Sequence, residues 1–325
     1  MDLRLALYEL TERGRLDASA SRRLHTLAGL DEAPAGMAQA APLGVAMLAA
    51  ALGGLGIIFW IAANWESLGR GARFGLLEGA VLIAGLGALA RPAARAPFAL
   101  VSLLAIGGLL AYFGQTYQTG ADPWQLFALW ALLALPLCAG VRSDLLWAPW
   151  ALVAMSAVSL WVHAHAGHRW RIEPDDLAAH AAGWAAAAAL ITMLSPWARR
   201  ATGAGAWSLR VAVTLTVVMV SATALGALFH SPVAPHYALA LGLLGIAAVA
   251  WALPRSFDVY ALSAVALGVD TLLVAGLARW LLHAGHGDEI GELLVIGLVA
   301  AGLLAGTVSA ILRLSRRGTP AQELT

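Results

Sequence analysis

The chain has 325 residues, of which 60% are hydrophobic and only 12% are charged. A soluble domain carries roughly 25% charged residues, so a water-soluble globule of this length would lack the polar surface that it needs. The net charge of +1 provides no basic field to hold a nucleic acid. A single cysteine, Cys138, excludes an internal disulfide and a cysteine-based metal site. The composition therefore predicts an integral membrane protein whose main partner is the lipid bilayer.

The first 32 residues differ from the rest of the chain, because leucines alternate there with charged and polar residues. Gly14 is typical of a helix end and Asp17 of the N-cap of a following helix. We expect residues 1–32 to form a small cytoplasmic helical hairpin. It either lies on the membrane or on its own bundle, or it docks a partner. Residues 33–41 are expected to form a linker.

Apolar stretches then follow one another along the chain. No residue from Ala33 to Trp65 is charged, and a spanning helix needs about 20 apolar residues. The sequence predicts an all-α polytopic helix bundle over residues 42–313, followed by a disordered cytoplasmic tail over residues 314–325. The predicted spans are 42–64, 73–90, 97–114, 123–140, 145–164, 177–195, 208–229, 234–253, 259–282 and 290–312. Spans 73–90 and 123–140 are short, and a re-entrant hairpin there would lower the count from ten to eight.

The distribution of arginine predicts the orientation of this bundle. With the N-terminus inside, 15 of the 20 basic residues fall in the inner segments, as the positive-inside rule requires. The five on the outer side are Arg70, Arg73, Arg169, Arg171 and Arg279. We therefore expect a protein of the bacterial inner membrane with both termini in the cytoplasm.

Two motifs stand within the first 140 residues. One is Gly56-Ile57-Ile58-Phe59-Trp60-Ile61-Ala62-Ala63-Asn64-Trp65. The other is Gly114-Gln115-Thr116-Tyr117, followed by Asp122-Pro123-Trp124 and Trp130-Ala131-Leu132. Together with the N-terminal segment, they resemble the domain of unknown function 2157 family of predicted bacterial multi-pass membrane proteins. The resemblance implies an inner-membrane protein without an assigned reaction, and it supplies no catalytic residues.

The same motifs place polar groups at the outer ends of the first spans. We expect one outer-rim group that consists of Asn64, Trp65, Glu66, Gln115, Tyr117 and Asp122. An Asn and a Gln at the bilayer edge can link helix ends by hydrogen bonds, with tryptophan rings at headgroup level. The alternative is that the outer-rim group lines the mouth of a cavity.

Ionisable residues inside the spans are the next candidates, because each costs free energy unless it is paired or hydrated. Asp270 lies near the middle of the ninth span, with Thr271 beside it and Ser263 two turns earlier. Asp270 either titrates in a transport path or serves as a packing device inside the bundle. Glu78 lies near the outer end of the second span and can reach the interface.

Eight of the nine histidines fall at or near the predicted outer face. Imidazole binds zinc and similar metals and titrates near neutral pH. A metal ion on the periplasmic side is therefore one hypothesis, and solvated loop histidines are the other. The candidate ligands are His163, His165, His168, His180, His283 and His286.

Three functions fit these observations. The favoured one is a carrier or channel for a small solute, an ion or a lipid. The alternative is a non-catalytic assembly, stress-response or signalling component, which would act as a homo-oligomer or with a membrane partner. The third is a membrane enzyme acting on a lipid or glycan at the outer interface. It ranks last because the sequence has no nucleophile elbow, P-loop or zincin signature.

Overall fold

The computed structural model of the chain describes residues 10–13, 17, 19–20, 23–24, 35–118, 120–167, 171–284 and 289–318. Over these residues the regular structure is helical and includes no strand, which confirms the predicted all-α fold. Most of the predicted N-terminal hairpin lies outside the described residues. Its described part includes Asp17, whose carboxylate accepts hydrogen bonds from the backbone N–H groups of Ser19 and Ala20. Asp17 thus caps a helix start as predicted, and the bond from Ala20 lowers the pKa of its carboxyl group.

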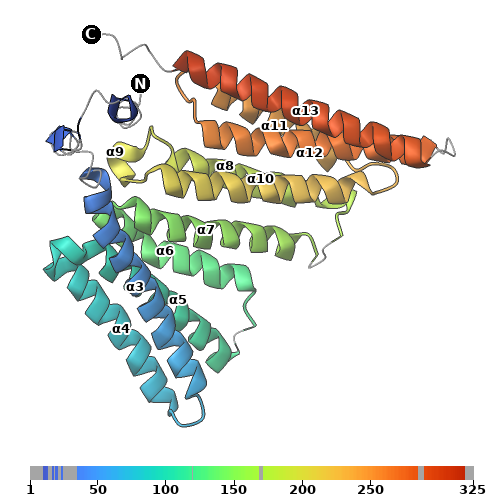
Figure 1. Cartoon of the computed structure of the whole chain (residues 1–325). Coiled ribbons are helices and arrows are strands. Elements are labelled where there is room, and N and C mark those ends of the chain that lie inside the picture. Colours follow the sequence, from blue (N-terminus) through green and yellow to red (C-terminus); the bar gives the residue numbers. More distant parts are fainter. Residues whose placement is uncertain are drawn as a thin grey trace.

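In the described part of the chain, each predicted span corresponds to one helix (Figure 1). These helices are α3 (Ala35–Ala63), α4 (Arg70–Ala90), α5 (Arg95–Tyr117), α6 (Pro123–Val141), α7 (Asp144–His165), α8 (Leu177–Leu194), α10 (Ala206–Leu228), α11 (His236–Ala252), α12 (Val259–Ala284) and α13 (Glu289–Gly318). Three short helices are η1 (Pro92–Ala94), η2 (Pro174–Asp176) and α9 (Arg199–Thr202). Within the described residues, nine helices are long and apolar enough to cross a membrane, and α11 is shorter.

The hairpin alternative for the two short spans is wrong. Helices α4 and α6 are continuous over 21 and 19 residues, because each extends by one to three residues past the predicted limits. The span of minimal length is instead α11, with 17 residues.

The two helix ends that differ most from the predicted limits are the start of α3 and the end of α13. Helix α3 begins at Ala35, so most of the predicted linker is helical. Alanine, methionine and glutamine there favour a helix, and Pro42 removes only one of its hydrogen bonds. At the other end of the chain, α13 continues to Gly318 into the predicted tail. Arginines near a helix C-terminus interact favourably with the helix dipole, and they reach the bilayer edge easily. Residues 319–325 lie outside the described residues.

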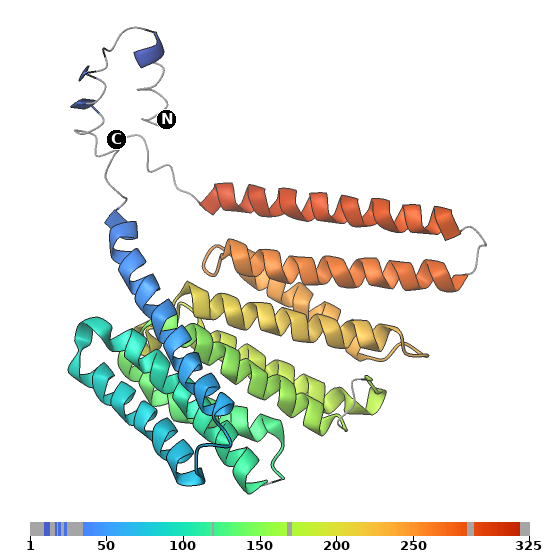
Figure 2. The ribbon, with the colours of Figure 1, turned by 60° about the horizontal axis from the view of Figure 1, so that its bottom comes forward.

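The helices form a bundle around a central row. Helix α7 contacts α5 and α10, and α10 contacts α12. The remaining long helices flank this row: α3 and α4 pack on α5, α6 on α5 and α7, α8 on α7 and α10, α11 on α10 and α12, and α13 on α12. Helices α3–α5 are inclined to α10–α13 in two views (Figures 1 and 2). Helix α3 begins and α13 ends at the same end of the bundle, the near end; the opposite end is the far end.

Tryptophan side chains tie neighbouring helices together. The indole N–H of Trp130 on α6 donates to the carbonyl of Leu103 on α5, at 2.8 Å. Trp150 on α7 donates in the same way to Ala131 on α6. Trp130 packs directly over Gly107, where an added Cβ would overlap the indole ring. Such bonds satisfy the indole donors where lipid tails offer no acceptor.

At the near end, α7 and α10 are fixed to one another by Asp144, the first residue of α7. Its carboxylate accepts hydrogen bonds from the backbone N–H groups of Gly205 (2.8 Å), Trp207 (2.8 Å) and Ser208 (3.0 Å). The hydroxyl of Ser208 donates to it as well, at 2.6 Å. A carboxylate at a helix N-terminus satisfies first-turn N–H groups and interacts favourably with the helix dipole. Asp144 therefore caps α10 from a different helix, and we call this contact the Asp144 clamp.

Candidate ligand-binding cavity

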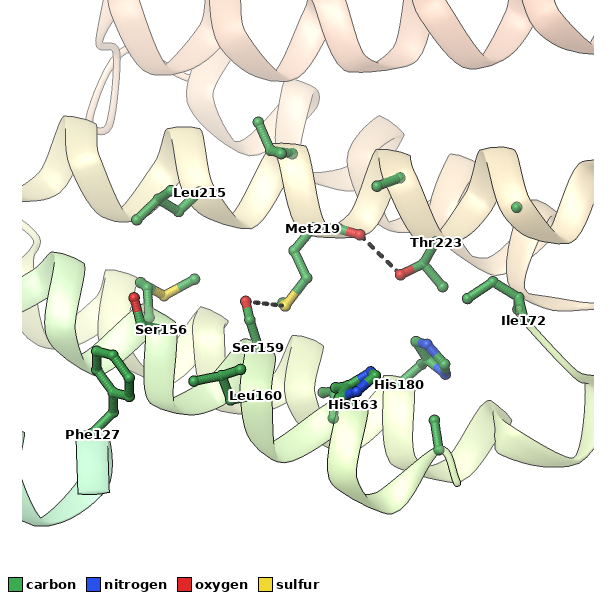
Figure 3. A pocket seen from close by; sticks show the side chains of 16 residues that line it. Phe127, Ser156, Ser159, Leu160, His163, Ile172, His180, Leu215, Met219 and Thr223 are labelled. Atoms are coloured by element: carbon green, nitrogen blue, oxygen red, sulfur yellow. Dashed lines mark hydrogen bonds between the residues drawn. The ribbon is translucent and has the colours of Figure 1, made fainter. Parts of the chain in front are cut away.

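Beyond the Asp144 clamp, a cavity of about 520 Å³ lies between α7 and α10 in the half of the bundle toward the far end. Helix α8 and the segment before it contribute His180 and Ile172, and α6 contributes Phe127. Side chains from α7 and α10 face one another across the cavity, with Phe127 toward one end and Ile172 at the other (Figure 3). The two helices are thus joined at the near end and enclose space farther along.

The cavity opens on the side of the bundle. Its lining residues Ser159, Val218 and Ala222 are exposed, and Val218 retains 57% of its accessible surface. Because α7 and α10 both qualify as membrane spans, an opening at this depth faces lipid tails.

Most of the lining is apolar, with five polar side chains among the lining residues. Ser156, Ser159 and His163 belong to α7, His180 to α8 and Thr223 to α10. In Figure 3, His163 and His180 lie toward the Ile172 end of the cavity, and Ser156 lies toward the Phe127 end. The cavity is therefore amphipathic along its length, with the imidazoles toward the far end of the bundle.

His180 has a second histidine behind it. His236, the first residue of α11, is fully buried, and its ring lies edge-on to that of His180 with centroids 4.9 Å apart. His180 keeps only 4% of its accessible surface, and its Nδ1 lies 3.0 Å from the carbonyl oxygen of Asp176. Both ring nitrogens of His236 are buried. The cavity wall thus contains a pair of buried imidazoles from two helices.

The other predicted histidines do not join this pair. His165 stacks on Trp161, with centroids 4.2 Å apart, and bonds to the Trp161 carbonyl. His283 is exposed and bonds to its own helix through the carbonyl of Arg279. His168 and His286 lie outside the described residues. Among the described residues, no three histidine, cysteine or acidic side chains lie close enough to hold a metal ion. The metal hypothesis therefore stays a prediction.

Asp270 lies between α12 and α13, and it is not among the residues that line the cavity. It is 9% exposed, and the Thr307 hydroxyl of α13 donates to its Oδ1 at 3.2 Å. Its Oδ2 is buried and has no hydrogen-bond partner in the described part of the chain. Of the two roles predicted for Asp270, this placement favours the packing device, because the carboxyl group bridges the last two helices.

The other intramembrane candidates are not gathered around Asp270. Thr271 is exposed and its hydroxyl bonds to the Leu267 carbonyl of its own helix. Ser263 is exposed on α12, and Glu78 is exposed on α4, eight residues from the start of that helix. None of the three is a lining residue of the cavity.

The outer-rim group lies at the far end, and its two motifs meet through residues that the sequence analysis did not select. Trp65 packs against Tyr112, with ring centroids 5.2 Å apart, and the guanidinium of Arg73 lies 4.1 Å from the Trp65 ring centre. Tyr117 approaches Phe74, whose ring also packs on Tyr112. These aromatic and cation–π contacts, rather than hydrogen bonds of the Asn and Gln side chains, connect α3, α4 and α5.

The amides of the outer-rim group do not cross-link helices. Asn64, directly after α3, donates to the Trp60 carbonyl in the last turn of that helix, at 2.9 Å. Gln115 and Glu66 are exposed, and Asp122 stands at the N-cap position of α6. The rim therefore fits the structural interpretation better than a cavity mouth.

The sequence analysis missed five functional candidates: Asp144, His236, Ser156, Ser159 and Thr223. A charge just before an apolar run signals Asp144, since it marks a span boundary. His236 belongs to the set of outer-face histidines, but its partner comes from a different helix. For Ser156, Ser159 and Thr223, single hydroxyl groups within apolar helices give no signal.

The fold and the lateral cavity define this chain as a polytopic α-helical membrane protein. Residues 8–147 match the sequence model of a family described as "Predicted membrane protein (DUF2157)", which confirms the resemblance seen in the two motifs. Neither the curated proteins nor the solved structures include a match to the chain.

Proposed function

We propose that this membrane protein is a carrier for an amphiphilic molecule, which enters the cavity between α7 and α10 from the lipid side. The observation that supports this proposal most directly is the cavity itself, which is open at membrane depth and largely apolar, with its two imidazoles toward one end. Its volume of about 520 Å³ falls within the range of about 300–1,000 Å³ that is usual for small-molecule sites.

The arrangement of polar groups supports an amphiphile rather than an ion. Apart from the two imidazoles, no ionisable side chain stands among the lining residues, so a bare ion would lose its hydration without compensation. The Asp144 clamp holds α7 and α10 together at the near end, which favours one-sided access over a continuous pore.

The orientation of the bundle indicates in which leaflet the imidazole end of the cavity would lie. The excess of arginine on the near side supports a location in the bacterial inner membrane with both termini in the cytoplasm. The imidazole end of the cavity would then lie in the outer leaflet. The other functions predicted from the sequence stay predictions.

A cavity-filling variant tests this function. Ala222 lines the cavity, so Ala222→Trp should displace a bound amphiphile. Ala301 is exposed on α13 and is not a lining residue, so Ala301→Trp is the matched control. The protein would be purified in nanodiscs of defined lipids, and the amphiphiles that remain bound would be counted by native mass spectrometry. We expect the loss of one bound molecule in Ala222→Trp alone. Equal occupancy in both variants would refute the proposal.

A further inference from the structure

Three hydroxyl groups line the cavity, and each already donates its proton in a hydrogen bond within the protein. The hydroxyl of Ser156 donates to the Leu152 carbonyl at 2.9 Å, and that of Thr223 donates to the Met219 carbonyl at 2.9 Å. The Ser159 hydroxyl donates across the cavity to the Met219 sulfur, at 3.5 Å. A hydroxyl that has donated its proton keeps only its acceptor lone pairs. These three side chains therefore offer acceptors to a ligand.

His180 follows the same logic. A carbonyl oxygen only accepts, so the contact between Nδ1 of His180 and the Asp176 carbonyl places the proton on Nδ1. In the neutral ring, Nε2 is then an acceptor. His236 packs edge-on against the ring and holds its orientation. Because His180 is a lining residue and nearly buried, the cavity is where this acceptor meets a ligand.

The lining also lacks the groups that a charged headgroup requires. A phosphate is normally bound by arginine, lysine or several N–H donors, and none of the lining residues is Arg or Lys. An ammonium group is normally paired with a carboxylate or an aromatic cage, and no acidic residue is in the lining. The chemistry of the cavity thus matches an uncharged group that donates hydrogen bonds.

We propose that the amphiphile is a neutral lipid with a free hydroxyl group, whose hydroxyl donates to Nε2 of His180 while its chains fill the apolar part of the cavity. This inference rests on the proposed function and specifies its substrate class. Diacylglycerols and long-chain alcohols both carry this chemistry. His236 acts here as a positioning residue, since it touches His180 and is not in the lining.

Three probes with the same acyl chains test the assignment: dioctanoylglycerol, its methyl ether and dioctanoyl phosphatidic acid. Binding to the protein in nanodiscs would be measured by competition with a fluorescent diacylglycerol. We expect dioctanoylglycerol to bind about tenfold more tightly than either other probe, because a site built to bind a hydroxyl discriminates strongly against its absence. The affinities of dioctanoylglycerol and of a long-chain alcohol of matched length would be compared, and the tighter binder would show which of the two lipid classes supplies the hydroxyl.

Variants separate this inference from the proposed function. In His180→Phe, dioctanoylglycerol should bind only as weakly as its methyl ether, whose own affinity should stay the same. His236→Phe should reduce the preference while it retains the aromatic packing, and His165→Phe is the control because His165 is exposed and not in the lining. If all three probes bind equally well and Ala222→Trp weakens that binding, the hydroxyl assignment is overturned while the proposed function stands. Absence of any Ala222-dependent binding would overturn the proposed function as well.

Discussion

The Asp144 clamp allows a quantitative prediction, because the carboxylate of Asp144 accepts hydrogen bonds from four donors at the start of α10. The perturbation is Asp144→Ala. Trp207 is 61% exposed, so water can replace the carboxylate at its N–H group. Ser208 is fully buried, so its N–H group loses its acceptor without compensation. Its hydroxyl retains a longer bond to the Gly205 carbonyl, at 3.3 Å.

The magnitude follows from these differences in exposure. A buried donor that loses its partner costs about 1–3 kcal/mol, and the loss of a capping side chain costs about 0.5–2 kcal/mol. Since these terms overlap, we expect Asp144→Ala to lower the free energy of unfolding by about 2–4 kcal/mol. Asp258 is the matched control, because it caps α12 at the same end of the bundle and its carboxylate accepts a hydrogen bond from the Ala261 N–H group, at 2.8 Å. Asp258→Ala should cost about 1 kcal/mol.

Reversible unfolding in mixed micelles with increasing SDS would measure both values. The clamp should also determine how α7 and α10 are spaced, so Asp144→Ala should weaken amphiphile binding more than Asp258→Ala does. If Asp144→Ala destabilises the protein no more than Asp258→Ala, the carboxylate does not hold the two helices together.

Two further interhelical bonds give smaller effects. Thr307→Val removes the hydroxyl that donates to Asp270, and it should cost about 1 kcal/mol, as polar contacts between membrane helices do; the same SDS titration measures it, and an unchanged midpoint would show that the bond contributes nothing. Trp130→Phe keeps an aromatic ring but leaves the Leu103 carbonyl without its indole donor. We expect a loss of about 1 kcal/mol, and a stabilised variant in thermal unfolding would contradict this role of the indole.

The sequence predicts the spans well, because each is long enough and apolar enough to be recognised alone. It predicts their ends less well, as Pro42 illustrates: a proline is compatible with a helix start, and here it lies inside α3. Which helices touch is beyond this kind of prediction. Lipid-facing and protein-facing positions are both apolar, so the pattern that reveals the buried face of a soluble helix is weak here.

The candidate site shows the same limit. His163 and His180 are predicted at the outer face, and both are in the cavity lining. Their pocket, however, depends on α7 lying beside α10, and the contact between His180 and His236 depends on α8 and α11 converging. Asp270 stands out in the sequence because it is charged, whereas its partner Thr307 carries no comparable signal.

The position of the cavity relative to the family match has a consequence for evolution. The match ends at residue 147, just after Asp144, and Phe127 is the one lining residue that lies within it. The partners of Asp144 on α10 lie outside the match. Proteins that share only this matched part with the chain would inherit α3–α6 and one half of the clamp, without the walls that contact a ligand. In this chain the matched portion is therefore a frame beside the cavity, and most of the walls that contact a ligand lie in the rest of the chain.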